Sequence, residues 1–487
     1  MLRPLTLLHR WLGVSVCLLF AMWFATGIVM HFVPFPALTE AERIAGLAPV
    51  DPSRIAHGPG AAASASRVKN ALRVRLLQRS DGPVYLVSGA SGVEALHAAD
   101  LTKAAVSSEQ LALAIAVDSA RQRRMDPSRA TFSELANYDQ WTVPNRFDLH
   151  RPLYRITLDD DDGTELYVSS ATGEVVLDTT RRERWWNYVG SVAHWIYPTV
   201  LRSNWVAWDK TVWTLSLVAL VAAMSGGLLG AMRIKSRVVS PYRGWHAWHH
   251  VLGLLSTLFV LTWSFSGWLS MDHGRLFSRG QLTEAEQTAV AGALAWDTLP
   301  ADDMRRIAPQ GREVEWFVFD RRFYRRVRTG LDAQFLFARD FEAGWSASPQ
   351  GFLEPREIRA FVERMATGCK PPVMVDSEDD YVSPASMPNA PVYRSVCGNV
   401  WFHVDGASGA ILERFDPSRR AYRWLYSGLH TMDFPMLSAH PTLRAALIVI
   451  LCGCGFVFSL TGVVIGWRRL RLRFAPNRPA GARSGVS

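Results

Sequence analysis

Hydrophobic residues are concentrated in four blocks, each long enough to cross a bilayer, which takes about 20 apolar residues. The blocks are Leu7–Phe32, Trp208–Met232, Trp245–Met271 and Leu443–Trp467. Two long segments of ordinary globular composition separate the first block from the second and the third from the fourth. We therefore expect a four-helix transmembrane bundle with two large segments outside the membrane. No small-residue cleavage site follows the first block, which predicts a retained anchor rather than a signal peptide.

These blocks divide the chain into helices, outer segments and cytoplasmic connections. We expect transmembrane helices at 1–33, 206–233, 245–271 and 441–467, outer segments at 34–205 and 272–440, a cytoplasmic loop at 234–244 and a basic tail at 468–487. Within the outer segments, alternating apolar runs around Gly/Asp turns predict antiparallel hairpins. Ser107–Arg121 and Glu354–Met365 have helical periodicity. Each outer segment is therefore expected to form an α+β domain, with a helix on a small antiparallel sheet.

The distribution of basic residues predicts the orientation in the membrane. The short loop carries Arg233, Lys235, Arg237 and Arg243, and the tail carries Arg468, Arg469, Arg471, Arg473, Arg478 and Arg483, in both cases without an acidic residue. Loops rich in Lys and Arg stay in the cytoplasm. Both termini are therefore expected in the cytoplasm and both outer segments on the opposite side. The net charge of +9 comes largely from these regions, which indicates topology rather than nucleic-acid binding.

Histidine and glycine recur at matched spacing in the two halves of the chain. His9 precedes Gly13 by four residues, as His249 precedes Gly253. His194 lies 32 residues before a glycine that opens a Gly-rich helix end, and so does His430. Strand-like motifs in the outer segments, Pro-x-Tyr-Arg among them, repeat at about the same offset. We interpret the chain as a two-fold internal repeat of span, outer domain, His-bearing segment and span.

The repeat places the histidines in two pairs at different depths. His9 and His249 fall at the cytoplasmic ends of their spans, and His194 and His430 near the outer surface. Ionisable residues inside a membrane are costly and usually functional. Two imidazoles that face each other in a helical bundle suit a low-spin haem iron. We therefore expect two haems, one per leaflet, which would give an electron path across the membrane.

Other histidines compete for individual ligand positions. His31 shares a helix face with His9 at the opposite depth, and His246 and His250 flank His249. His31 and His250 are therefore kept as alternative haem ligands. A zinc site is disfavoured because the histidines are spread over both membrane faces. No Cys-x-x-Cys-His motif occurs, so covalent haem attachment is not expected.

The chain resembles the PepSY-associated transmembrane helix family of iron-regulated membrane proteins, which includes ferrisiderophore reductases. The matching motifs are His-x-x-x-Gly at the starts of spans one and three, Ala193-His194 and Leu429-His430, and [Ser/Thr]-Gly-x-x-[Leu/Ile]-Gly at 225–230 and 461–466. Further matches are Pro-x-Tyr-Arg at 152–155 and 391–394, Asp139-Gln-Trp141 and Asp380-Tyr381. The resemblance covers nearly the whole chain.

The resemblance implies a bacterial inner-membrane protein with two PepSY-like periplasmic domains and b-type haems. It implies an oxidoreductase that passes electrons outward to a ferric siderophore or similar iron substrate. His9, His249, His194 and His430 would then be axial ligands to haem iron. The sequence contains no flavin or nicotinamide domain, so the electron donor would be a quinol or a separate cytosolic reductase.

Two other interpretations remain open from the sequence. In one, the PepSY-like domains bind a peptide or partner and the helices are anchors of a non-redox sensor. In the other, the protein is an iron or haem permease, although four spans in one chain make a poor transport pathway. The paired histidines favour the redox interpretation, because a simple anchor needs none. The sequence also leaves open whether Cys369 and Cys397 form a disulfide, which an oxidising compartment would allow.

Overall fold

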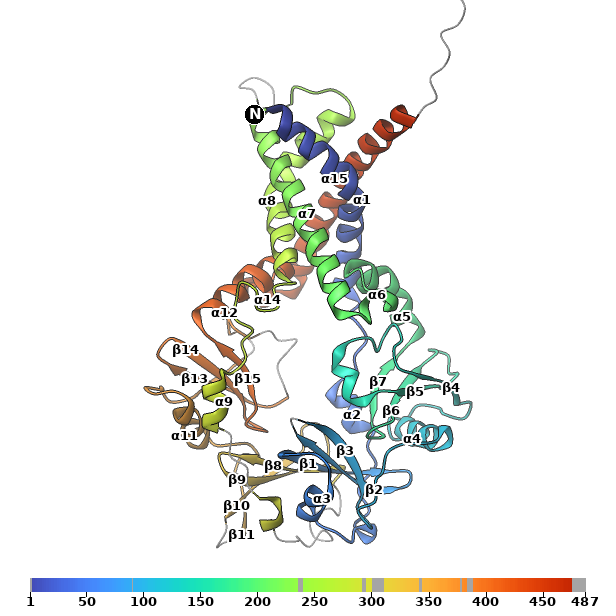
Figure 1. Cartoon of the computed structure of the whole chain (residues 1–487), viewed down its shortest axis with the longest axis vertical. Coiled ribbons are helices and arrows are strands. Elements are labelled where there is room, and N and C mark those ends of the chain that lie inside the picture. The colour runs from blue at the N-terminus through green and yellow to red at the C-terminus, as the bar shows by residue number, and fades with distance from the viewer. Residues whose placement is uncertain are drawn as a thin grey trace, which may run out of the picture.

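The structure is a computed structural model of the chain (Figure 1). It describes residues 2–89, 91–234, 240–290, 295–299, 311–340, 344–376, 379–382 and 389–474. Four of the basic residues used to predict orientation, Lys235, Arg237, Arg478 and Arg483, lie outside the described residues.

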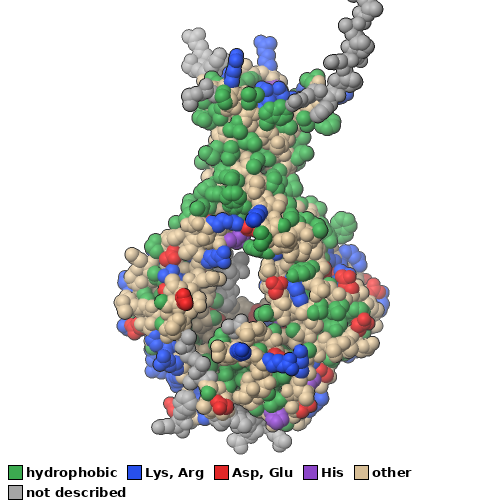
Figure 2. All heavy atoms as spheres, in the orientation of Figure 1, with side chains coloured by type: hydrophobic (Ala, Val, Ile, Leu, Met, Phe, Trp, Pro, Cys, Tyr) green, Lys and Arg blue, Asp and Glu red, His purple; other side chains and the backbone are tan. Residues whose placement is uncertain are grey.

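Among the described residues, four helices are long and apolar enough to cross a membrane, as the sequence predicts. They are α1 (Leu2–Phe32), α7 (Trp205–Met232), α8 (Trp245–Leu269) and α15 (Pro441–Phe474). Helices α1 and α8 each pack against both α7 and α15. Leu18, Leu255 and Leu258 leave most of their side chains exposed on the bundle, whose surface is largely apolar (Figure 2). An apolar surface of this size requires a nonpolar environment, so the chain is a membrane protein.

The His-bearing segments are not continuous with the spans that follow them, as expected. The first contains α5 (Arg181–Asn187), a π-helical turn at Tyr188–Val192 and α6 (Thr199–Arg202); the second contains α12 (Pro417–Tyr422), a π-helical turn at Arg423–Gly428, α13 (Leu429–Thr431) and α14 (Pro435–Ser438). The helical runs that carry His194 and His430 end just after these residues, where Ile196 and Met432 adopt the left-handed backbone conformation (φ 50° and 53°). Pro198 and Pro435 follow these breaks and stand at the starts of α6 and α14, where a missing amide costs no helical hydrogen bond. Helix α7 then begins at Trp205, where the Asn204 side chain accepts a hydrogen bond from the Ala207 amide. The π-helical turns are not evident in the sequence.

Two small antiparallel sheets lie beyond the outer end of the bundle (Figure 1). The strands of the first, in spatial order, are β4 (Thr131–Ala136), β5 (Leu153–Thr157), β6 (Glu165–Ser169) and β7 (Val175–Thr179). Those of the second are β12 (Val373–Val375), β13 (Val392–Cys397), β14 (Val400–Asp405) and β15 (Ile411–Phe415). Helix α4 (Glu109–Gln122) packs on the first sheet and α11 (Pro355–Met365) on the second. Each outer segment thus contains the expected helix on an antiparallel sheet.

A third sheet joins the two outer segments, which the expectation of one domain per segment does not include. Its seven strands, in spatial order, are β11 (Gly344–Ala347), β10 (Gln334–Asp340), β9 (Arg322–Arg328), β8 (Glu313–Phe319), β1 (Ala71–Arg79), β2 (Gly82–Gly89) and β3 (Gly92–His97). The junction is the antiparallel pairing of β1 with β8, in which Arg73 pairs with Phe317 and Leu76 with Val314. The apolar face buries Val74, Leu76 and Trp316 in one core. The outer segments therefore form a single connected region.

The opposite face of the shared sheet is buried under ion pairs. Glu313 is 1% exposed. Its carboxylate lies 2.7 Å from Arg43 Nη1, 3.2 Å from Arg75 Nη1 and 3.6 Å from Arg328 Nη1. These guanidinium groups belong to α2 (Glu40–Ala45), β1 and β9. The cluster therefore ties both outer segments together by charge as well as by the β-ladder.

The outer region encloses a central opening below the bundle, visible in the space-filling view (Figure 2). In the space-filling view, basic side chains gather at the rim of this opening nearest the bundle (Figure 2). The second outer segment also carries a disulfide between Cys369 and Cys397, which resolves the alternative that the sequence left open. The two-fold repeat remains an interpretation of the sequence.

Candidate functional site

The inner pair of histidines lies between α1 and α8. The ring centroids of His9 and His249 are 6.4 Å apart, with 34° between the ring planes. His9 Nδ1 lies 3.2 Å from the Ala222 carbonyl and 3.3 Å from Ser225 Oγ, both on α7. His249 Nδ1 lies 2.9 Å from Thr461 Oγ1 on α15. The structure thus brings the two sequence-predicted inner residues together, with each ring anchored to a different neighbouring helix.

The outer pair repeats this arrangement with the roles of the segments exchanged. His194 and His430 come from the segments before α7 and α15, and their ring centroids are also 6.4 Å apart. His194 Nδ1 lies 2.9 Å from Thr26 Oγ1 on α1, and His430 Nδ1 lies 3.1 Å from Ser266 Oγ on α8. In this pair the helices α1 and α8 supply the hydroxyl groups, and the His-bearing segments supply the imidazoles.

The hydroxyl groups determine which nitrogen of each ring carries the proton. Every one of them donates its own hydrogen to a carbonyl of the preceding helical turn: Ser225 to Ala222, Thr461 to Phe458, Thr26 to Met22 and Ser266 to Trp263. A hydroxyl has one hydrogen to donate, so its remaining role toward the ring is that of acceptor. Each imidazole must therefore donate from Nδ1. The lone pair of Nε2 is left for a further partner, as in a metal-ligating histidine.

A glycine follows each of these hydroxyl residues and lies next to the imidazole. A Cβ atom built on Gly226 would lie 2.6 Å from His9 Cε1, and one on Gly267 would lie 3.4 Å from His430 Cε1. The corresponding distances are 3.5 Å at Gly462, to His249, and 3.7 Å at Gly27, to His194. In each [Ser/Thr]-Gly pair of the sequence the hydroxyl thus contacts a ring. Only at Gly226 does the absence of a side chain make room for the imidazole, because at the other three positions a Cβ would lie at an ordinary contact distance.

The spacing within each pair fits one metal ion between two imidazoles. Metal–imidazole bonds are about 2.0–2.1 Å long, which puts the centroids of two rings on opposite sides of one metal roughly 6 Å apart. Among the described residues, no group of three or more His, Cys, Asp and Glu side chains could hold a metal ion. Each pair could therefore offer a metal ion at most two imidazole ligands. A porphyrin, which brings four nitrogen ligands of its own, would be compatible with such a pair.

A comparison with known protein families agrees with these features. The model of the family described as the PepSY-associated TM region matches residues 6–469. The chain belongs to this family. The resemblance seen in the sequence is thereby confirmed. No curated protein matches the chain.

The competing histidines of this PepSY-associated TM protein lie outside both pairs. His31 is in the last turn of α1 with its ring 5.0 Å from that of Phe32. His250 is buried, and its Nε2 lies 3.0 Å from the Gly230 carbonyl. His246 is exposed. The structure therefore places these three in surroundings different from those of the paired rings, while a ligand role for any histidine remains a prediction.

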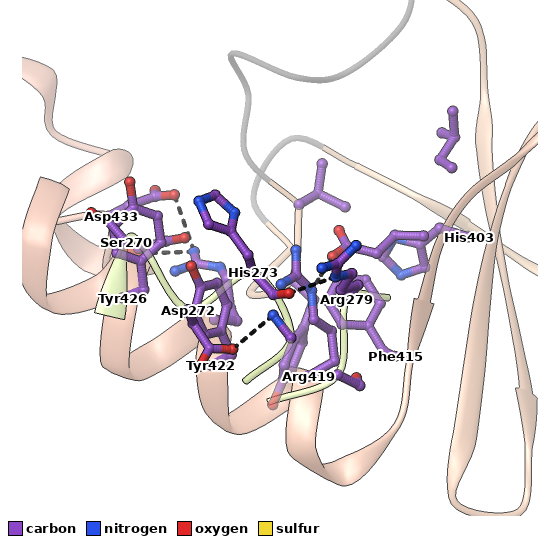
Figure 3. Close-up of a pocket in the computed structure, with 18 of the residues that line it drawn as sticks. Ser270, Asp272, His273, Arg279, His403, Phe415, Arg419, Tyr422, Tyr426 and Asp433 are labelled. Atoms are coloured by element: carbon purple, nitrogen blue, oxygen red, sulfur yellow. Dashed lines mark hydrogen bonds and ion pairs between the residues drawn. The ribbon is translucent and has the colours of Figure 1, made fainter. Parts of the chain in front are cut away.

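A cavity of about 1010 Å³ lies at the outer end of the bundle, next to the outer pair. Its wall includes Tyr426, whose ring stacks on that of His430 at 5.6 Å and 22°. Figure 3 shows Tyr426 and Tyr422 at one end of this cavity, His403 and Phe415 at the other, and His273 between them. Sequence reasoning missed this site because its residues come from separate parts of the chain: the start of α7, the segment that follows α8, strands β14 and β15, and the second His-bearing segment.

His403, at the far end of the cavity, is uncharged at neutral pH. Burial and the neighbouring Arg394 lower the pKa of His403 to about 4. Its Nε2 accepts a hydrogen bond from Arg394 Nε at 2.9 Å. His403 is therefore a neutral acceptor, and positive charge in the cavity comes from arginines nearer the bundle.

Proposed function

We propose that this PepSY-associated TM protein is an inner-membrane, haem-dependent oxidoreductase that carries electrons outward to reduce a periplasmic ferric siderophore or similar iron substrate. The observation that carries the proposal is the set of four histidines in two facing pairs, each held by a hydroxyl group at Nδ1. When bound, haem b would supply reversible one-electron chemistry at each site. A non-redox anchor would need neither the pairs nor the matched hydroxyls.

In this proposal His9 and His249 hold the inner haem, and His194 and His430 hold the outer haem. Ser225 and Thr461 keep the inner rings in the Nδ1–H form, and Thr26 and Ser266 do the same for the outer rings. A hydrogen bond from the second ring nitrogen orients a ligating imidazole and raises its basicity. The chain's own contribution is thus to orient the ligands and to keep them neutral.

The two histidine levels are joined by packed aromatic side chains. His9 and Thr26 are 17 residues apart on α1, which corresponds to about 25 Å along a helix. Between them, the rings of Phe24 and Trp263 lie 5.9 Å apart and those of Phe24 and Phe259 6.2 Å apart. This close-packed core supports a route for electrons within the bundle rather than a permeation path.

The proposed direction of electron transfer rests on features at the two ends of the helix bundle. The disulfide Cys369–Cys397 suits an oxidising compartment such as the periplasm. At the opposite end of the bundle lie Arg233, Arg243 and Arg468, as expected for a cytoplasmic face. A quinol or a cytosolic reductase would supply electrons at the inner pair. Electrons would leave at the outer pair and reduce Fe(III) to Fe(II), which siderophores hold less tightly.

The visible absorption spectrum of the full chain, purified in detergent from haem-replete cells, tests the proposal. We expect a Soret band that shifts on reduction with dithionite, with about two haems per chain. A chain that carries no Soret band would refute the redox function and favour the alternative of a non-redox PepSY-domain sensor or binding protein.

Gly226→Ala is expected to disturb the inner site far more than Gly462→Ala. The new Cβ would lie 2.6 Å from His9 Cε1, closer than nonbonded carbons approach, whereas at Gly462 the distance to His249 is an ordinary 3.5 Å. Because close-packed interiors do not absorb such an overlap, His9 must move, and about half of the haem should be lost. Gly13→Ala is the control, since no atom lies within 4 Å of its Cβ. Equal haem-to-protein ratios in all three variants would contradict this role of Gly226.

A further inference from the structure

The cavity beside the outer pair contains an arginine whose hydrogen-bonding capacity is largely unused. Arg423 is 9% exposed and lines the cavity. Its Nη2 donates to the Asp433 carbonyl at 2.9 Å and lies 3.3 Å from Asp433 Oδ2. Among the described residues, Nε and Nη1 of Arg423 have no hydrogen-bond partner although both are buried. Buried polar groups without partners are uncommon and call for an explanation, such as a ligand.

The acidic side chains of the cavity are already occupied. Asp272 accepts hydrogen bonds from the backbone amides of Gly274, Leu276 and Phe277. Glu413 pairs with Arg419 at 2.5 Å. The Asp433 carboxylate accepts a hydrogen bond from Ser438 at 2.7 Å and lies 3.3 Å from Arg423 Nη2.

Donors therefore outnumber acceptors among the groups that remain free. Arg279 adds to them: it is exposed at the cavity, and its one hydrogen bond within the described residues runs from Nε to the His273 carbonyl at 2.6 Å. Figure 3 shows Arg279 beside His273. A ligand that fills the cavity must supply hydrogen-bond acceptors, and preferably negative charge.

The local backbone accounts for the position of Arg423. It begins the π-helical turn Arg423–Gly428, a type of distortion often found at functional sites. The same turn contains Tyr426, which stacks on His430. The turn thus places on the wall of one cavity a guanidinium with two unpartnered nitrogens and an aromatic contact to the outer histidine pair.

We propose that this cavity binds the carboxylate groups of a soluble, anionic ferric chelate, with Arg423 as the buried anchor and Arg279 as a second donor at the entrance. The inference rests on the proposed function, because it makes the chelate the acceptor of the electrons. The volume of about 1010 Å³ is sufficient for a chelate of drug-like size. Guanidinium groups bind carboxylates through strong charge-assisted hydrogen bonds. The acceptors are therefore carboxylate-bearing chelates rather than uncharged or cationic ones.

Gallium(III) citrate provides a test that does not depend on electron transfer, because gallium(III) is not reduced under these conditions. Its affinity for the full chain in detergent is measured by isothermal titration calorimetry. We expect Arg423→Gln to weaken binding by about tenfold or more, and Arg279→Gln by about threefold. The exposed position of Arg279 makes its variant a safeguard if Arg423→Gln fails to fold. The matched control is Arg420→Gln: Arg420 hydrogen-bonds the Asn399 and Phe415 carbonyls and is not part of the cavity wall.

Several outcomes would overturn the inference. Unchanged affinity in both Arg423→Gln and Arg279→Gln would do so, as would an equal loss in Arg420→Gln. A gallium(III) trihydroxamate, which has no carboxylate, should bind without dependence on Arg423; a tenfold dependence there would refute the substrate class. If gallium(III) citrate does not bind, but native mass spectrometry detects an anionic phospholipid lost in Arg423→Gln, the site holds a lipid headgroup instead. Arg423-dependent citrate binding in a chain without haem would support the site while refuting the proposed function.

Discussion

Replacement of His9 by alanine is expected to reduce bound haem from about two to about one per chain. The substitution leaves His249 as the one protein ligand of the inner site, and a single imidazole cannot complete a six-coordinate iron. The outer site should be unaffected, because it lies about 25 Å away along α1. His194→Ala should likewise remove the outer haem and spare the inner one. The pyridine haemochrome assay on protein of known concentration gives the ratio in each case.

Controls for this experiment come from the histidines outside the pairs. His440→Ala removes an exposed ring and should keep both haems. His31→Ala and His250→Ala should keep both as well, since neither ring faces one of the pairs. Full haem content in both His9→Ala and His194→Ala would reject the proposed ligand pairs. Loss of one haem in His31→Ala would transfer a ligand role to that residue.

Glu313→Gln is expected to lower the free energy of unfolding of the outer region by about 3–5 kcal/mol, the usual effect of removing one partner from a buried ion pair. The substitution leaves the buried guanidinium groups of Arg43 and Arg75 without their shared counter-charge. Urea unfolding followed by tryptophan fluorescence measures the change. The control is Glu134→Gln, because Glu134 pairs with Arg155 at a site where about half of its side chain is exposed. Surface pairs contribute about 0–1 kcal/mol, and an equal loss in both variants would contradict the central role of Glu313.

The same cluster predicts a pH dependence. Burial opposes the charged form of Glu313, but the charges of Arg43 and Arg75 outweigh it and hold the pKa of this carboxyl below its usual range. A group with a lowered folded-state pKa stabilises the fold above its unfolded-state pKa, about 4.3 for Glu, and loses that contribution as the pH falls further. The urea concentration at which half of the native chain is unfolded should therefore decrease once the pH falls below about 4–5. It should drop less in Glu313→Gln, and parallel profiles for the two proteins would contradict this assignment.

The spans could be recognised from the sequence because a bilayer demands long, uninterrupted apolar runs. The start of α7 at Trp205 lies one residue from the predicted start, but α15 continues to Phe474, past the predicted end of its span at Trp467. Pro198 and Pro435 are visible in the sequence as signals for the start of a helix, since proline fits the first turn. The left-handed residues Ile196 and Met432, which end the preceding helical runs, carry no such signal. The four paired histidines stood out because polar residues are rare in such runs and these recur at matched spacing.

The shared sheet could not be predicted from the sequence, because the pairing of Arg73 with Phe317 joins strands that are far apart in the chain. No local sequence pattern specifies such a pairing. For the same reason the burial of Glu313 and Glu315 is not evident from the alternating charged residues of β8. The two unpartnered nitrogens of Arg423 depend on which neighbours its π-helical turn brings near. A sequence shows that an arginine is present but not whether its donors are satisfied.

The sequence by itself determined the family, the membrane spans and the histidines worth pairing, because these follow from composition and spacing along one chain. The tertiary structure alone decided which hydroxyl anchors each imidazole, and hence that Nε2 remains free for a ligand. It also decided that both outer segments share one sheet and that a cavity with an unsatisfied arginine adjoins His430. Hydrogen bonds, ion pairs and cavities form between segments distant in the chain, so their partners are set by packing and not by local pattern.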